Sequence, residues 1–169
     1  MSISLYDFSI PALTRGLANL SGLLDKAEAH AAAKKYDSVV LAQARLFPDM
    51  YPLLRQVQIT CDTAKGAAAR LAGVDVPKHE DTEATFADLK ARVAKTADFV
   101  KSINAAQLKD AENRSIELKF PNGSWKFTAV GYLTDFVLPN FYFHISMVYA
   151  LLRKNGVEIG KADYLGAIQ

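Results

Sequence analysis

The chain has 169 residues, of which 50% are hydrophobic and 22% are charged, and its formal net charge is +2. This composition excludes a disordered chain, and the small net charge gives no support for nucleic-acid binding. No apolar run reaches the ~18–20 residues of a membrane span, and no secretion signal is visible at the N-terminus. The single cysteine, Cys61, excludes an internal disulfide. We therefore expect one cytoplasmic domain over residues 1–169, with no membrane or nucleic-acid partner.

Two segments in the first half of the chain have the residue spacing of amphipathic helices. The apolar stripe of the first is Ile10, Leu13, Leu17, Leu20, Leu24 and Ala27. Ser2 or Ser4 is placed to cap this helix, and Pro11 predicts either a kink or a helix that starts there. A short helical piece is expected at 38–46. The stripe of the second long helix is Leu54, Val57, Cys61, Ala64, Ala68 and Leu71. Gly73 is expected to end it.

A third helix is followed by a change of pattern. The stripe of this helix is Phe86, Leu89, Val93, Thr96, Val100 and Ile103. Asp81 or Thr82 is the expected cap, with Glu83 in the first turn, where the helix dipole favours a carboxylate. Before residue 128, apolar and polar residues alternate on both sides of Asn122-Gly123. This pattern predicts a small β-hairpin.

The last helix is expected over about residues 129–154 and contains a histidine in its apolar part. Its stripe is Val130, Leu133, Val137, Asn140, His144, Met147 and Leu151. At 100° per residue, Asn140 and His144 lie opposite the polar side of this helix, so both are expected to point inward. Pro139 is expected to bend the helix. A buried imidazole needs a hydrogen-bond partner, and Asn140 is one turn away.

If the second and fourth helices face each other, their polar residues converge. Six side chains are then expected to share one pocket: Gln58, Asp62, Asn140, His144, Tyr6 and Tyr132. Three roles remain open for His144: a hydrogen-bonded core residue, a ligand-binding residue or a metal ligand. Cys61 lies on an apolar stripe, which favours a packing role over a nucleophilic one.

Three stretches carry a resemblance to a known family: FPDMYPLLRQVQITCDTAKGAAARLAG, EDTEATFADLKARVAKTADFVKSI and LPNFYFHISMVYALLRKNGVEIGKADYLG. Nearly the whole chain resembles the DinB/YfiT-like helical-bundle superfamily and, within it, a bacterial branch of unknown function. The resemblance implies an all-α, up-down-down-up four-helix bundle, often homodimeric. In this chain the β-hairpin is expected as an insertion before the last helix.

Many members of that superfamily hold a divalent metal such as Zn²⁺ or Ni²⁺ with three histidines, and some are thiol-dependent transferases. The matching positions here are His144, Asn140 and, approximately, Gln58. Two of the three ligands are thus amides, which bind these metals more weakly than imidazole. The leading interpretation is a small-molecule-binding bundle with a polar pocket between the second and fourth helices. The alternatives are a non-catalytic dimeric interaction or stress-response protein with a decayed site, and a metal-assisted thiol-dependent transferase. Whether the chain is an enzyme stays open.

Overall fold

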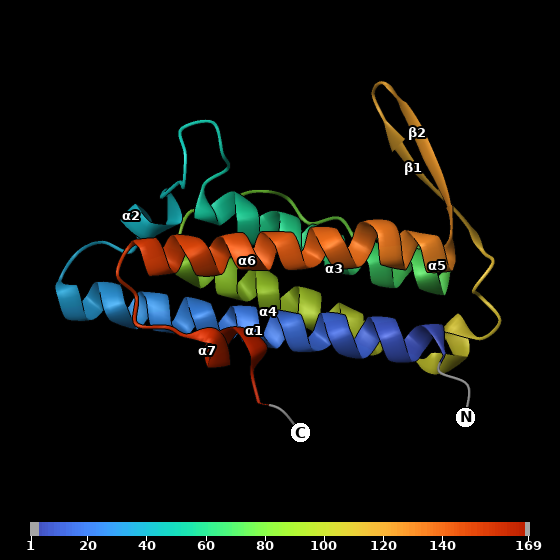
Figure 1. Cartoon of the computed structure of the whole chain (residues 1–169), viewed down its shortest axis with the longest axis horizontal. Helices are drawn as coiled ribbons and strands as arrows, with labels where there is room; N and C mark the ends of the chain where they lie inside the picture. The colour runs from blue at the N-terminus through green and yellow to red at the C-terminus, as the bar shows by residue number, and fades with distance from the viewer. Residues whose placement is uncertain (1–3, 168–169) are drawn as a thin grey trace.

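The bundle consists of long helices that pack side by side in a computed structural model, which describes residues 4–167. The long helices are α1 (Leu5–Lys34), α3 (Leu53–Ala72), α4 (Phe86–Ser102) and α6 (Leu138–Lys154). In Figure 1, α1 and α6 run in one direction and α3 and α4 in the other, which is the predicted up-down-down-up order. The four-helix-bundle prediction is confirmed. Because α3 and α4 are parallel, the chain between them must run back along the length of the bundle.

Shorter elements connect and cover the long helices. They are α2 (Val39–Ala42), η1 (Ala105–Leu108), α5 (Ala129–Gly131), the π-helical segment η2 (Tyr132–Val137) and α7 (Lys161–Leu165). The predicted hairpin is also present, with β1 (Ser115–Phe120) antiparallel to β2 (Gly123–Thr128) and Phe120 opposite Gly123. It projects away from the bundle (Figure 1). Within residues 4–167, no helix combines the length and apolarity that crossing a bilayer requires.

The start of α1 is fixed by a reciprocal cap. The Ser4 side chain accepts a hydrogen bond from the Asp7 backbone, and the Asp7 carboxylate accepts one from the Ser4 backbone. The alternative cap, Ser2, lies outside the described residues. The helix begins at Leu5 and continues through Pro11, so it does not start at the proline as one expectation had it.

The start of α4 differs from the prediction. Thr85 caps this helix in a capping box with Asp88, so neither Asp81 nor Thr82 is the cap. Glu83 precedes the helix and is not in its first turn. The physical reason is that Thr85 and Asp88 satisfy two free backbone N–H groups together, which a single acidic side chain cannot do.

The last helix is interrupted by the π-helical segment η2, directly before Pro139. Proline has no N–H to donate to the carbonyl of Asp135, and a π-helical turn changes which side chains point inward. Val130, predicted to be buried, is 43% exposed. The residues of α6 that are buried are Phe141, His144, Ile145, Val148, Leu151 and Leu152.

Helix α3 is the most enclosed element, because it packs against α4 on one side and α6 on the other. Its alanines allow close approach of both neighbours, and polar residues on several sides of it are also buried: Gln56, Gln58, Thr60, Thr63 and Lys65. Buried polar groups need hydrogen-bond partners. The two faces of α3 therefore carry two separate polar networks.

Candidate functional site

The α3–α6 seam is the contact at which Gln56 and Thr63 of α3 meet Asn140 and His144 of α6. His144 is 8% exposed, and its Nδ1 lies 2.6 Å from Gln56 Oε1. Gln56 Nε2 donates to the carbonyl of Tyr51 at 3.2 Å. The Gln56 Oε1 is therefore the acceptor, and His144 Nδ1 carries the hydrogen. Asn140 Nδ2 donates to Thr63 Oγ1 at 2.8 Å. His144 points inward as predicted, but its partner is Gln56 and not Asn140.

The seam favours a neutral imidazole. Burial, and then the positive charge of Arg55, lower the pKa of His144 below its ordinary value of 6.5. A neutral ring with its Nδ1–H bonded to an amide has the hydrogen-bonding pattern of a core residue. The two seam donors, His144 Nδ1 and Asn140 Nδ2, thus find their acceptors on α3.

A run of three pockets extends from α1 to α7: the first lies along α1 beside Lys101 of α4 and Ala167, the second where α1, α6 and α7 meet, and the third between α6 and α7. Their volumes are about 600, 50 and 230 Å³. Arg15 lines the first and second pockets, and Tyr164 lines the second and third. We name this run the tyrosine groove, after four of its lining residues: Tyr6, Tyr142, Tyr149 and Tyr164.

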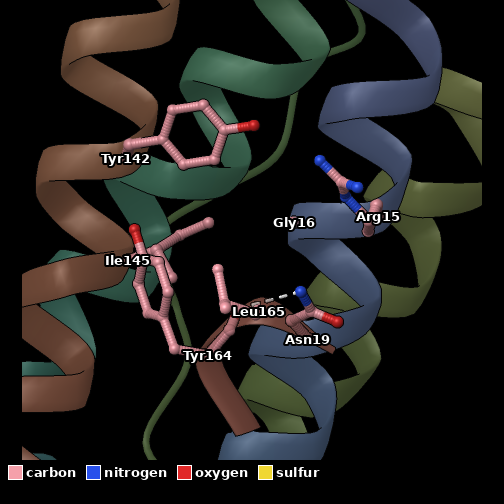
Figure 2. Close-up of a pocket in the computed structure, with 7 residues that line it drawn as sticks. All are labelled: Arg15, Gly16, Asn19, Tyr142, Ile145, Tyr164 and Leu165. Atoms are coloured by element: carbon pink, nitrogen blue, oxygen red, sulfur yellow. Dashed lines mark hydrogen bonds between the residues drawn. The ribbon is translucent and has the colours of Figure 1, made fainter. Parts of the chain in front are cut away.

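The middle of the tyrosine groove is built by three elements. Arg15 from α1 and Tyr142 from α6 point into the same space from opposite walls (Figure 2). Asn19 Nδ2 donates to the carbonyl of Tyr164 at 2.9 Å, which holds α7 against α1. The Ser146 and Tyr164 hydroxyls are 3.0 Å apart, which ties α7 to α6 as well. The short helix α7 is therefore fixed as one wall of the groove.

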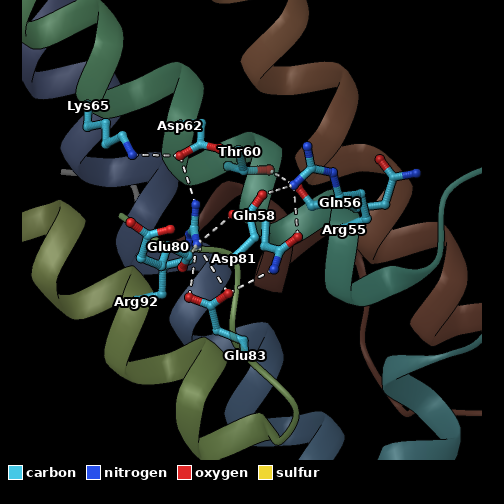
Figure 3. Close-up of polar contacts among 10 residues, drawn as sticks. All are labelled: Arg55, Gln56, Gln58, Thr60, Asp62, Lys65, Glu80, Asp81, Glu83 and Arg92. Atoms are coloured by element: carbon cyan, nitrogen blue, oxygen red, sulfur yellow. Dashed lines mark hydrogen bonds and ion pairs between the residues drawn. The ribbon is translucent and has the colours of Figure 1, made fainter. Parts of the chain in front are cut away.

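The second face of α3 meets α4 and the connection that precedes α4. Two residues along a helix correspond to a rotation of about 200°, so Gln58 lies nearly opposite Gln56. Arg92 contacts Asp62 Oδ1 at 2.8 Å and Glu83 Oε1 at 2.9 Å, and Gln58 Nε2 donates to Glu83 Oε2 at 2.8 Å (Figure 3). These contacts tie α3 and α4 to the connecting segment.

Arg92 is the centre of this ionic network. Its side chain is 2% exposed, it also contacts Asp81 Oδ1 at 3.0 Å, and it donates to the carbonyl of Glu80 at 3.1 Å. Burial alone would raise the pKa of the Glu83 carboxyl, but hydrogen bonds from Arg92 and Gln58 outweigh it and hold that pKa below its ordinary value. The network fixes residues 73–85, which return along the bundle and make α3 and α4 parallel.

The residues present do not fit the divalent metal that the superfamily resemblance implies. His144 Nδ1 is bonded to Gln56, the Asn140 amide nitrogen is directed at Thr63, and Gln58 lies on the far side of α3. In the part of the chain that the structure describes, no three His, Cys, Asp or Glu side chains are grouped to hold a metal ion. Three convergent donors, the minimum for a site of this type, are not assembled.

Cys61 is fully buried, and burial raises the pKa of its thiol to about 12. A thiol with this pKa stays protonated at neutral pH, and the thiolate is the nucleophilic form. The geometry therefore agrees with the packing role expected for Cys61.

Residues 5–165 match a family described as a domain of unknown function, DUF1993. The chain belongs to the DUF1993 family. It is also similar to the crystal structure of a DinB family member protein from Shewanella denitrificans, with 42% identity over 97% of this chain and 93% of that chain and a TM-score of 0.90. No curated protein matches. The predicted relationship to DinB-like proteins of unknown function is confirmed.

In this DUF1993 chain the six expected pocket residues lie in four places. Asn140 and His144 belong to the α3–α6 seam, and Gln58 and Asp62 belong to the ionic network. Tyr6 lines the tyrosine groove. Tyr132 is buried at the other end of α3, where Arg70 donates to its hydroxyl at 3.1 Å. The expected convergence of these residues in one pocket is wrong, because it placed Gln58 and Asp62 on the α6 face of α3.

The residues that the sequence pattern did not identify are Gln56, Arg15 and Tyr142. Gln56, Thr60 and Thr63 recur at i, i+4 and i+7, so helical spacing could have placed all three on one face. Arg15 and Tyr142 carry no such signal, because the wall that completes their groove is the distant segment α7.

Proposed function

We propose that this DUF1993 protein binds a small molecule in the tyrosine groove. The observation that supports the proposal is that Arg15 and Tyr142 point from facing walls into open volume (Figure 2). By contrast, the polar groups of the α3–α6 seam bond to one another. The largest pocket of the groove, about 600 Å³, lies within the ~300–1,000 Å³ range of ligand sites. The proposal thus keeps the small-molecule binding expected from the sequence, but it assigns the binding site to the tyrosine groove and not to the α3–α6 seam.

A blocking substitution tests this assignment. Ala18 is exposed and lines the 600 Å³ pocket, so Ala18→Trp fills it from the same helix that carries Arg15. Ala29→Trp places the same side chain at an exposed position further along α1 and is the matched control. A small-molecule screen by thermal shift, followed by calorimetry, is expected to find ligands that bind the parent and Ala29→Trp but not Ala18→Trp.

The same screen with His144→Gln decides between the two regions. Ligands assigned to the tyrosine groove should bind this variant as they bind the parent. Ligands that Ala18→Trp still binds, but His144→Gln loses, would return the site to the α3–α6 seam and contradict the proposal. A screen that finds no ligand for the parent would also count against it.

A second candidate, a dimeric interaction protein, is favoured by the hairpin. Trp125 is 55% exposed and Phe120 is 44% exposed, with ring centroids 4.8 Å apart. The inner part of the hairpin packs on the bundle through the buried side chains of Ile116 and Leu118, whereas Phe120 and Trp125 stay largely exposed. A second copy of the chain can cover these two rings. We expect a two-chain mass by light scattering at micromolar concentration, a single-chain mass for Trp125→Lys, and no change for the exposed control Phe47→Lys. A parent of single-chain mass would contradict this candidate.

A further inference from the structure

The tyrosine groove has an unbalanced charge. Its lining includes Arg15, Lys101 and Lys161, and the lining of its three pockets, as far as residues 4–167 form it, includes no Asp or Glu. The rest of the bundle mixes both signs closely, with 20 Lys and Arg against 18 Asp and Glu in the whole chain. A concave surface that carries only cations attracts anions.

Among the described residues 4–167, the three groove cations have none of the ion pairs that other cations of the bundle have. Lys26 pairs with Asp163 at 2.6 Å and Lys90 with Asp25 at 2.7 Å. Within residues 4–167, the ion pairs involve Lys and Arg residues other than those of the groove. The groove therefore offers positive charge that the described part of the chain does not neutralise.

The shape of the largest pocket adds a second requirement. Arg15 and Lys101 lie on its wall together with the apolar side chains of Ile10, Pro11 and Ala18, and with the ring of Tyr6. Its volume of about 600 Å³ is many times the ~30 Å³ that one water molecule occupies, so a bare inorganic anion would leave most of it unfilled. The tyrosine ring and the apolar wall suit a flat organic body.

We infer that the ligand of the tyrosine groove is a small organic anion, an aromatic carboxylate, with its carboxylate at Arg15 and Lys101 and its ring against Tyr6 and Pro11. Arg15 is the specificity-determining residue, because a guanidinium can donate two parallel hydrogen bonds to one carboxylate. Lys101, from the end of α4, supplies a second charge without that directional preference. This inference rests on the proposed binding function and adds the chemical class of the ligand.

Matched acid and amide pairs test the inference. Benzoate with benzamide, and indole-3-acetate with indole-3-acetamide, have nearly the same shape and differ in charge. By calorimetry at fixed salt, we expect the acids to bind the parent at least about tenfold more tightly than the amides, since a hydrogen bond to a charged group contributes about 1.5–3 kcal/mol. Inorganic phosphate is expected to bind more weakly than either acid.

Charge variants identify the residue responsible. Arg15→Gln should weaken the acids by at least about tenfold and leave the amides unchanged, and Arg15→Lys should recover part of the loss. Lys109→Gln removes one positive charge at an exposed position outside the groove lining and should leave both classes within about twofold of the parent.

The outcomes separate this inference from the proposed function. Equal binding of acids and amides, blocked in both cases by Ala18→Trp, would overturn the anion assignment and leave small-molecule binding in the groove intact. Acids that bind Arg15→Gln as tightly as the parent would also overturn it. Acid binding that Ala18→Trp does not affect would place the ligand elsewhere and contradict both statements.

Discussion

The two polar sides of α6 can be compared directly, because each uses residues one helical turn apart. On one side, Asn140 and His144 bond to Thr63 and Gln56 of α3. On the other, Tyr142 and Ser146 line the tyrosine groove. Moving two residues along the helix rotates from one side to the other.

The comparison shows why burial of a polar residue does not by itself indicate a functional site. The α3–α6 seam has the buried imidazole and the amides, and its donors His144 Nδ1 and Asn140 Nδ2 are bonded within the chain. The tyrosine groove has exposed cations and tyrosine rings around open volume. If this contrast is correct, substitutions of internally paired polar residues should lower stability, and substitutions of the exposed cations of the groove should change ligand binding alone.

The largest effect is expected from Arg92→Ala, which removes the buried side chain at the centre of the ionic network. Three carboxylates, those of Asp62, Asp81 and Glu83, lose their common partner. Loss of one member of a buried ionic network destabilises by about 3–5 kcal/mol, and we expect the lower end because Asp62 and Asp81 can regain water. Urea unfolding measures the change. Lys78→Ala, which removes an exposed pair with Glu80, is the control and should lower the free energy of unfolding by less than about 1 kcal/mol. Equal losses for both variants would contradict a special role of Arg92.

The next effect concerns the backbone beneath the groove. A Cβ at Gly16 would overlap the ring of Phe141, which is fully buried and cannot move aside freely. Gly16→Ala should therefore lower the free energy of unfolding by about 1–3 kcal/mol through overpacking. Gly22→Ala on the same helix meets nothing within 4 Å and should raise stability by up to about 1 kcal/mol, because alanine favours the helix. Thermal and urea unfolding of the two variants should move in opposite directions, and parallel changes would show that α1 is not held against α6 at Gly16.

His144→Ala tests the seam at two levels. At pH 7.5 it should lower the free energy of unfolding by about 1–3 kcal/mol, because Gln56 loses its buried partner. Phe143→Ala removes the exposed neighbouring ring and should have a smaller effect.

The pH dependence of stability gives the second test of His144. Its folded-state pKa lies below the ordinary value of 6.5, so the unfolded chain takes up a proton first as the pH falls. Stability is therefore complete above about pH 6.5 and is lost as the pH falls below it. Burial, followed by Lys65 and Lys95, lowers the pKa of His79 in the same direction, so the comparison is made in a His79→Gln background. In that background His144→Ala should give a shallower loss of stability between pH 7 and 5, and an unchanged slope would mean that the imidazole is not held neutral.

The fold could be predicted from the sequence because its causes are local. The apolar stripe of Leu17 and its neighbours in α1, and the hairpin signal at Asn122-Gly123, act within a few residues, although the turn itself is formed by Pro121 and Asn122, and Gly123 begins β2. The three-residue spacing of Thr85 and Asp88 also indicates the cap of α4, although the sequence-based prediction places that cap at Asp81 or Thr82. Here the error came from competition between several adjacent capping residues, of which the structure uses the reciprocal pair.

The site could not be predicted in the same way, because its causes are non-local. Helix α3 is buried on several sides, so its apolar stripe does not reveal whether Gln56 or Gln58 meets α6. In the sequence pattern, an arginine such as Arg92 indicates the solvent-exposed face of a helix. In the fold, the returning segment that contains Glu83 covers it. The two pockets of the tyrosine groove beside α6 exist only once α7, about twenty residues beyond Tyr142, folds back onto α1.

The smallest effect on stability is expected at the groove itself, and this is the sharpest test of the comparison. Arg15 is exposed, and among residues 4–167 the ion pairs of the bundle involve other cations. Arg15→Gln should therefore change the free energy of unfolding by less than about 0.5 kcal/mol, as surface substitutions do. The same variant should weaken binding of an aromatic carboxylate, measured on the same preparation by calorimetry. A residue that matters for binding but not for folding is one whose partner lies outside the chain. A loss of stability as large as that of His144→Ala would instead show that Arg15 has a partner within the protein, and the distinction between the two sides of α6 would fail.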